Sequence, residues 1–233
     1  MINRMVGEMV SRAVFGIVLL GASGVGWAQG AKALYPAMAP LEQYSSADEV
    51  ALARSAANEA VSRDAEVLVL GSRGYESAAK GTNGFVCVVE RSWATNFDDP
   101  QFWNPKMRAP HCFNAAAARS VLPAYLKRTE LVLSGMPKEQ VQARMKEAVA
   151  KKVFGAPEEG SMCYMMSKQG YLNDGAGHWH PHVMFFLPTT DAAKWGANLK
   201  DAPIFSAQAD PEPVTTFMVP VMKWSDGTME EMK

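Results

Sequence analysis

The sequence predicts a single α+β domain in which an antiparallel sheet of about six strands carries two main helices. Short runs of β-branched and aromatic residues gather towards the two ends of the chain, and segments with helical spacing lie between them. Strands and helices therefore do not alternate as they do in parallel-sheet proteins. The chain has 233 residues, of which 48% are hydrophobic, so it is long enough for one domain with a sizeable core.

The first 28 residues have the features of a secretory signal peptide. Arg4 and Arg12 precede an apolar run at 13–20, and Gly26-Trp27-Ala28 supplies the small residues that favour cleavage after Ala28. The apolar run is too short and too interrupted by glycine to span a bilayer, which needs roughly 20 apolar residues. We therefore expect a periplasmic or secreted protein with no membrane span after cleavage. The expected organisation is a signal peptide at 1–28, an extended arm at 29–45 and the domain at 46–233.

The first helix is predicted at 47–62. Ser46 is followed three residues later by Glu49, which is the pattern of a capping box at a helix N-terminus. Apolar residues then recur at helical spacing: Val50, Ala53, Ala57 and Val61.

Three strands are predicted next, at 66–70, 75–80 and 85–91. Asn83-Gly84 lies between the second and the third, and both residues tolerate the positive φ of a type I′ hairpin turn. The three strands are therefore expected to form an antiparallel meander.

The middle of the chain is predicted to be a proline-rich loop followed by helices. Segment 93–112 carries three prolines among aromatic residues, which indicates a loop packed against the core. Asn114 can cap a helix that runs to Ser120, and Pro123 ends, kinks or restarts it. The second main helix begins at Pro137, and Gly155 and Pro157 close it.

The last third is predicted to be β-structure, with strands at 161–168, 179–187 and 217–224. The stretches Gly81–Phe85, Met162–Lys168 and His180–Phe185 resemble segments of exported bacterial proteins of unknown function. This resemblance extends over most of the mature chain and implies export, but it implies no activity, cofactor or catalytic residue.

The three cysteines predict one disulfide and one free thiol, because an exported chain meets oxidising conditions. Cys87–Cys112 is the preferred pair, since it would join the proline-rich loop to a strand. The net charge of −1 becomes −2 when the leader is removed. This nearly neutral balance argues against nucleic acid as a main partner.

A histidine cluster is the main candidate for a functional site. His178, His180 and His182 occupy alternate positions and would share one face of a strand. Imidazole is a ligand for zinc, copper or iron. One ion can bind two neighbours in this row but not all three, because residues four apart in a strand are separated by about 13 Å. A metal site therefore needs further ligands, and the candidates are His111, Asp174, Cys163 and Met165.

Two classes of function remain open. In the first, the domain binds a metal ion or a small molecule through His180 and His182. In the second, it is a non-catalytic exported domain that binds an envelope component or an unidentified protein partner, and its histidines are structural. Neither a reaction nor a substrate follows from the sequence, and the pattern does not decide whether the protein is an enzyme.

Overall fold

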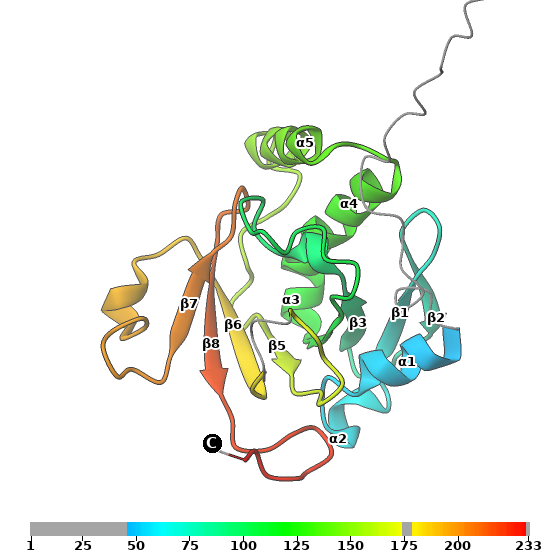
Figure 1. Cartoon of the computed structure of the whole chain (residues 1–233), viewed down its shortest axis with the longest axis vertical. Coiled ribbons are helices and arrows are strands. Elements are labelled where there is room, and N and C mark those ends of the chain that lie inside the picture. The colour runs from blue at the N-terminus through cyan, green and yellow to red at the C-terminus, as the bar shows by residue number, and fades with distance from the viewer. Residues whose placement is uncertain (1–45, 174–178, 232–233) are drawn as a thin grey trace, which may run out of the picture. The chain divides into compact units, whose positions relative to one another are not determined.

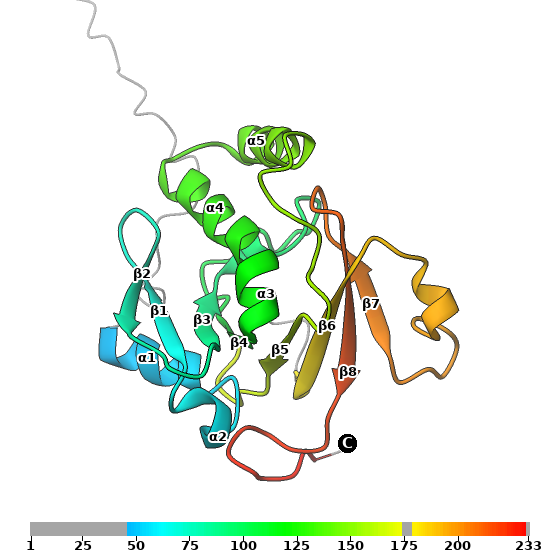
Figure 2. The same ribbon diagram turned by 180° about the vertical axis from the view of Figure 1, so that it is seen from behind.

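A computed structural model describes residues 46–173 and 179–231, and helices lie on both faces of one mixed sheet in it (Figures 1 and 2). The strands are β1 (Glu66–Leu70), β2 (Tyr75–Ala79), β3 (Val86–Glu90), β4 (Ala109–Phe113), β5 (Met162–Met165), β6 (His182–Pro188), β7 (Phe205–Gln208) and β8 (Val214–Pro220). Their order is β2-β1-β3-β4-β5-β6-β8-β7. Only β1 and β3 are parallel neighbours, and every other pair is antiparallel.

The predicted α+β class is confirmed, but the sheet has eight strands instead of about six. β4 and β7 lie outside the strands that the sequence predicts. β4 lies inside the segment expected to be a proline-rich loop, yet all five of its residues are buried. Cys87 and Cys112 face each other with a Cα–Cα distance of 4.0 Å, which is typical of a non-hydrogen-bonded pair. Pro110 lies two residues earlier and pairs with Val89 in the same way, so the N–H that proline lacks would point away from β3.

The expected antiparallel meander is wrong. β3 does not pair with β2, because the connection at 80–85 crosses the start of β1 and places β3 on its other side. Asn83 does not form a hairpin turn between paired strands. Its side chain donates to Val61 O at 2.7 Å and accepts from Phe85 N at 3.0 Å. Gly81 is required at this crossing, because a Cβ there would lie 2.1 Å from Glu66 N.

The described helices are α1 (Ser46–Arg54), α2 (Glu59–Ser62), α3 (Ala115–Ser120), α4 (Leu122–Leu133) and α5 (Lys138–Ala150), with 3₁₀ turns η2 (Ser92–Ala94) and η3 (Ala192–Trp195). The single helix expected at 47–62 is therefore two helices. Asn58 accepts a hydrogen bond from Val61 N and starts α2 as its N-cap. The prediction that Asn114 caps a helix ending at Ser120 is confirmed, and α4 begins with Pro123 in its first turn.

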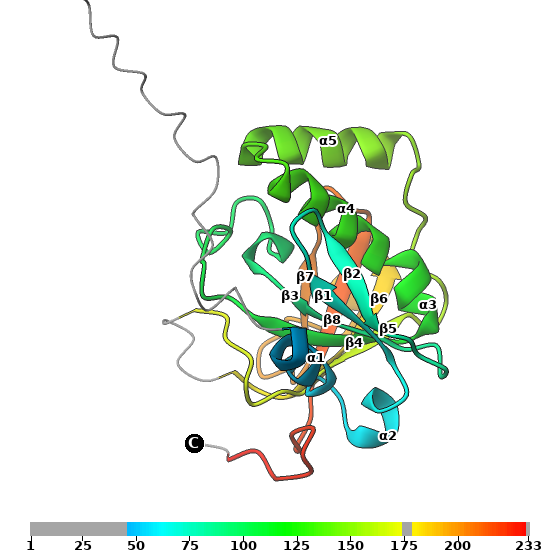
Figure 3. The ribbon, with the colours of Figure 1, turned by 90° about the vertical axis from the view of Figure 1, so that its right-hand side faces the viewer.

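The two faces of the sheet have separate cores. On one face, α1 packs over β1, β3 and β4. On the other face, α3 and α4 cover the larger core, and α5 packs on α4 (Figure 3). This second face contains the cavity described below.

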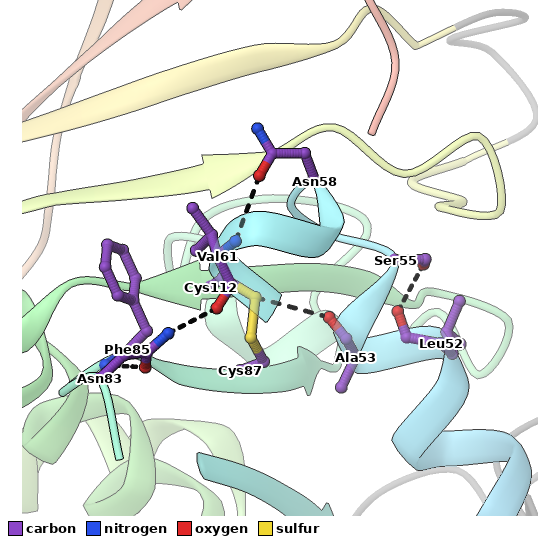
Figure 4. Close-up of a disulfide and its surroundings, with 9 residues drawn as sticks. All are labelled: Leu52, Ala53, Ser55, Asn58, Val61, Asn83, Phe85, Cys87 and Cys112. Carbon is purple, nitrogen blue, oxygen red and sulfur yellow. Dashed lines mark hydrogen bonds between the residues drawn. A yellow bond between two sulfur atoms is a disulfide. The ribbon is translucent and has the colours of Figure 1, made fainter. Parts of the chain in front are cut away.

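The predicted disulfide is confirmed: Cys87 and Cys112 are bonded, and Cys163 is free and buried. The bond joins directly opposed residues of β3 and β4 beneath α1, and Cys112 Sγ lies 3.7 Å from Ala53 O (Figure 4). It therefore joins two strands of the sheet and not a loop to a strand.

We expect that replacing both bonded cysteines by alanine lowers the free energy of unfolding by roughly 3–4 kcal/mol, because the bond closes a loop in the unfolded chain. Urea unfolding of the oxidised wild type and of the double variant measures this difference. Replacement of the free Cys163 by alanine is the control for thiol loss, since it leaves the bond intact. A double variant with wild-type stability would contradict the expectation.

Among residues 46–173 and 179–231, no helix is long and apolar enough to cross a membrane. The expected signal peptide and the extended arm, at 1–28 and 29–45, lie outside the residues that the structure describes.

Candidate functional site

A cavity of about 340 Å³ lies between the sheet and the layer formed by α3 and α4. Its sheet side comes from β3, β4, β5, β6 and β8, and its other walls come from α4 and from the loops that follow η2 and β7. Most of the lining is apolar, with methionine prominent: Met107, Met165, Met184 and Met218. The volume is at the lower end of the range of small-molecule sites, about 300–1,000 Å³.

The sheet side of the cavity carries two histidines with a methionine between them. His182 at the start of β6 pairs with Met165 of β5. On the other side of β5 lies β4, in which Cys112 pairs with Tyr164 and Phe113 pairs with Cys163. If this register is continued by one residue, His111 lies opposite Met165. All three side chains line the cavity. The two histidines come from strands two apart in the sheet, which corresponds to about 9.6 Å between their backbones.

Glu90 supplies a carboxyl group to the sheet side of the cavity. It ends β3, next to Ala109 of β4, and its Oε2 lies 3.5 Å from His111 Nδ1. This distance is too long for a hydrogen bond. Within the described part of the chain, the carboxyl group has no hydrogen-bond donor, although only 12% of the side chain is exposed.

Burial keeps both groups uncharged near neutral pH. Desolvation raises the pKa of Glu90 to about 8, and the positive charge of Arg128 lowers that pKa only in part. Desolvation also lowers the pKa of His111 to about 4, against the hydrogen bond to Ala109 O. The contact between Glu90 and His111 is therefore a contact of two neutral groups and not an ion pair.

In both cavity histidines, one ring nitrogen forms a hydrogen bond with a backbone carbonyl oxygen. His111 Nδ1 lies 2.9 Å from Ala109 O, and His182 Nδ1 lies 2.8 Å from His180 O. A carbonyl oxygen only accepts, so Nδ1 carries the proton in each neutral ring and Nε2 has a free lone pair. Burial lowers the pKa of His182 as well, which favours this neutral form. The cavity thus presents hydrogen-bond acceptors at both histidines.

A buried ion pair supports the wall opposite the sheet. Arg128 of α4 donates from Nη2 to both carboxylate oxygens of Glu212, at 2.9 and 2.8 Å. Arg128 also donates from Nη1 to Thr95 O at 2.8 Å and lies 4.5 Å from the centre of the Phe97 ring. The guanidinium group therefore holds together α4, the loop after η2 and the loop before β8.

The other predicted ligands are dispersed. His180 does not face the cavity: its Nδ1 lies 2.9 Å from Glu230 Oε1, and 62% of its side chain is exposed. Cys163 lies opposite Met184 and not opposite His182. His178 and Asp174 lie outside the described residues. Within residues 46–173 and 179–231, no group of three or more histidine, cysteine, aspartate or glutamate side chains is placed to hold a metal ion.

No protein-family model, no curated protein and no solved structure matches this chain. The site is therefore interpreted from its own geometry and chemistry.

The sequence predicts His111 and His182 as site residues, but it does not predict Glu90, Arg128 or Glu212. A signal for Glu90 was present, because alternation along β3 places it on the same face as Val86 and Val88. No local pattern marks Arg128 and Glu212 as partners, since they are 84 residues apart in sequence.

The two shifted pKa values predict an unusual dependence of stability on pH. The folded state holds the Glu90 proton more tightly than the unfolded chain between pH 4.5 and about 8, so this group lowers stability as the pH rises. His111 acts in the opposite direction between about pH 4 and 6.5, because the unfolded chain binds its proton more tightly. Glu90 acts alone above that interval, so we expect a loss of up to about 2 kcal/mol between pH 6.5 and 8.

Urea unfolding at pH 6.5 and 8 measures this loss. Glu90→Gln removes the titrating group and should abolish most of the difference. The other groups near Glu90 are Arg128, Tyr125 and Cys163, and burial raises the pKa of both Tyr125 and Cys163 further above neutrality. A drop of equal size in Glu90→Gln would show that another group is responsible.

Proposed function

We propose that this protein binds a small, predominantly apolar organic molecule in the cavity between the sheet and α4. The observation that carries the proposal is the combination of an apolar cavity of about 340 Å³ with a buried carboxyl group that has no donor among the described residues. Ligand sites typically join a mostly apolar lining to a few polar groups that fix orientation. The two histidines, each oriented by a backbone carbonyl, supply further polar groups of this kind.

An organic ligand fits the arrangement better than a metal ion. A closed metal site needs three or four ligands, whereas no group of three or more histidine, cysteine, aspartate or glutamate side chains comes together for a metal ion in the described part of the chain. Met165 lies between the two cavity histidines. Among the described residues, Glu90 is the carboxyl group on that side of the cavity, and it contacts the proton-bearing Nδ1 of His111. A larger molecule can contact these groups one at a time.

N-phenyl-1-naphthylamine, a neutral dye that fluoresces strongly in apolar surroundings, tests the proposal. We expect saturable binding of one dye per folded chain. Ala124 lines the cavity from α4, and Ala124→Phe should weaken binding by about tenfold or more because the larger side chain occupies the space.

The matched control is Ala143→Phe, which adds the same ring at an exposed position of α5 and should leave dye binding unchanged. Thermal unfolding must show that both variants are folded. If the folded wild type does not bind the dye, or if Ala124→Phe binds it as well as the wild type does, the cavity is not a binding site. The histidines would then be structural, as in the second class of function that the sequence left open.

We also propose that the protein acts in the periplasm or outside the cell. The Cys87–Cys112 disulfide supports this location, because such bonds persist in oxidising compartments. Mass spectrometry of the protein from expressing bacteria should find a mature chain that begins at Gln29. An intact N-terminus at Met1 in a chain confined to the cytoplasm would contradict the proposal.

A further inference from the structure

The polar groups on the sheet side of the cavity accept hydrogen bonds and offer few donors. In His111 and His182, Nδ1 donates its proton to a backbone carbonyl oxygen, so the lone pair of Nε2 can accept a hydrogen bond in each ring. No other residue of the described chain donates to these two Nε2 atoms or to the Glu90 carboxyl group. Such groups are costly to bury unpaired. A ligand rich in N–H donors would satisfy them.

The charges around the cavity favour a cationic ligand over an anionic one. Among the described residues, Arg128 is the only lysine or arginine that lines the cavity, and Glu212 already neutralises it through two hydrogen bonds. Its Nε has no hydrogen-bond partner, but that atom is fully buried and out of a ligand's reach. A ligand with a carboxylate or phosphate group would therefore be repelled by the acceptor atoms of the cavity and would find no unpaired positive charge among the described residues that line it. An ammonium group would instead meet Glu90. A cation bound beside this carboxyl group lowers its pKa, so Glu90 loses its proton on binding and pairs with the ammonium group as a carboxylate.

We propose that the ligand is a primary amine with an apolar body, and that the Glu90 carboxylate and the free Nε2 of His111 hold its ammonium group. This inference rests on the proposed function and names its ligand class. An ammonium group has three N–H donors and binds at hydrogen-bond distances of about 2.7–3.2 Å, so its partners can be further apart than the ligands of a metal ion. The apolar body packs among the methionines and Phe186.

Displacement of N-phenyl-1-naphthylamine compares three probes of nearly the same shape at pH 7: 2-phenylethylamine, 2-phenylethanol and 3-phenylpropionate. The amine is protonated at this pH. We expect it to displace the dye at a concentration about tenfold or more below that of the alcohol, and the acid to be the weakest. Glu90→Gln should remove the preference for the amine over the alcohol, each measured against that variant's own affinity for the dye. Glu139→Gln, an exposed change on α5, should alter neither this preference nor dye binding.

The outcomes separate this inference from the proposed function. If the dye binds but the alcohol or the acid displaces it as well as the amine does, the cavity binds apolar ligands and the inference is wrong. The same holds if Glu90→Gln keeps the amine preference. His111→Phe, which removes Nε2 and keeps a flat ring, provides the second variant should Glu90→Gln not fold. Stoichiometric zinc, copper or iron that survives dialysis and is lost in a His111→Ala/His182→Ala variant would overturn the inference in favour of a metal site.

Discussion

Glu49→Leu is expected to lower the free energy of unfolding by about 3–5 kcal/mol, because it removes the carboxylate that pairs with the buried Arg91 guanidinium. Glu49 Oε2 lies 3.1 Å from Arg91 Nη2, and the two side chains are only 3% and 1% exposed. Glu49 Oε1 also accepts from Leu70 N at 3.0 Å. The carboxylate thus attaches α1 to β1 and to the residue after β3.

Two further variants make the explanation specific. Glu59→Leu changes an exposed glutamate at the start of α2 and should alter stability by no more than about 0.5 kcal/mol. Glu49→Leu/Arg91→Met replaces both charges by apolar side chains and should recover much of the loss. Chemical denaturation of all four proteins gives the comparison. A double variant less stable than Glu49→Leu would show that Arg91 stabilises the fold by contacts other than this ion pair.

Glu212→Leu is expected to have an effect of similar size, about 3–5 kcal/mol, and to weaken dye binding as well. It leaves Arg128 unpaired between α4 and two loops that line the cavity. The side chains of this pair are only 6% and 9% exposed, so water cannot replace the lost carboxylate. The loss of dye affinity follows because the wall of the cavity would no longer be held in place.

The chain offers a matched control for this second prediction. Arg119 and Glu158 form another two-bond contact, but 62% and 44% of their side chains are exposed. Glu158→Leu should therefore change stability and dye binding little, because water solvates the remaining charge. Equal losses in Glu158→Leu and Glu212→Leu would mean that burial does not explain the effect. Unchanged dye binding in a destabilised Glu212→Leu would show that the ion pair does not shape the cavity.

The local signals in the sequence located most elements. Each of the six predicted strand segments overlaps an observed strand, and the Asn114 cap and the helix after Pro137 are present. These features depend on neighbours within a few residues, so they could be read directly. β4 could not, because its prolines and short length indicate a loop unless its partners β3 and β5 are known.

Glu49 shows how a tertiary contact replaces a local one. The sequence placed its carboxylate in a capping box with Ser46, but the structure directs it to Arg91, 42 residues away. Asn83-Gly84 is a similar case: the pair suits a hairpin, yet contacts with the α2–β1 segment carry the chain across β1 instead. For Glu49, a buried long-range contact outweighs a solvent-exposed local one, since unpaired buried groups are the more costly.

The site was predictable only in part. The sequence named His111 and His182 among the candidate ligands, and the structure brings these two to one cavity while His180 turns to Glu230. The prediction assumed that side chains alternate between the two faces of one strand from His178 to His182. This alternation does not extend to His180, because β6 begins at His182. A spacing pattern defines a shared face only where the residues belong to one strand.

By itself, the sequence determined the α+β class, the positions of most strands and helices, and the pairing of Cys87 with Cys112. The tertiary structure alone decided the order of the strands, the burial of Glu90 beside His111, and the partnership of Arg128 with Glu212. The physical reason is the range of the interactions. Caps, turns and alternation act between near neighbours, whereas strand order and the desolvation of charged groups depend on segments that only the complete fold brings together.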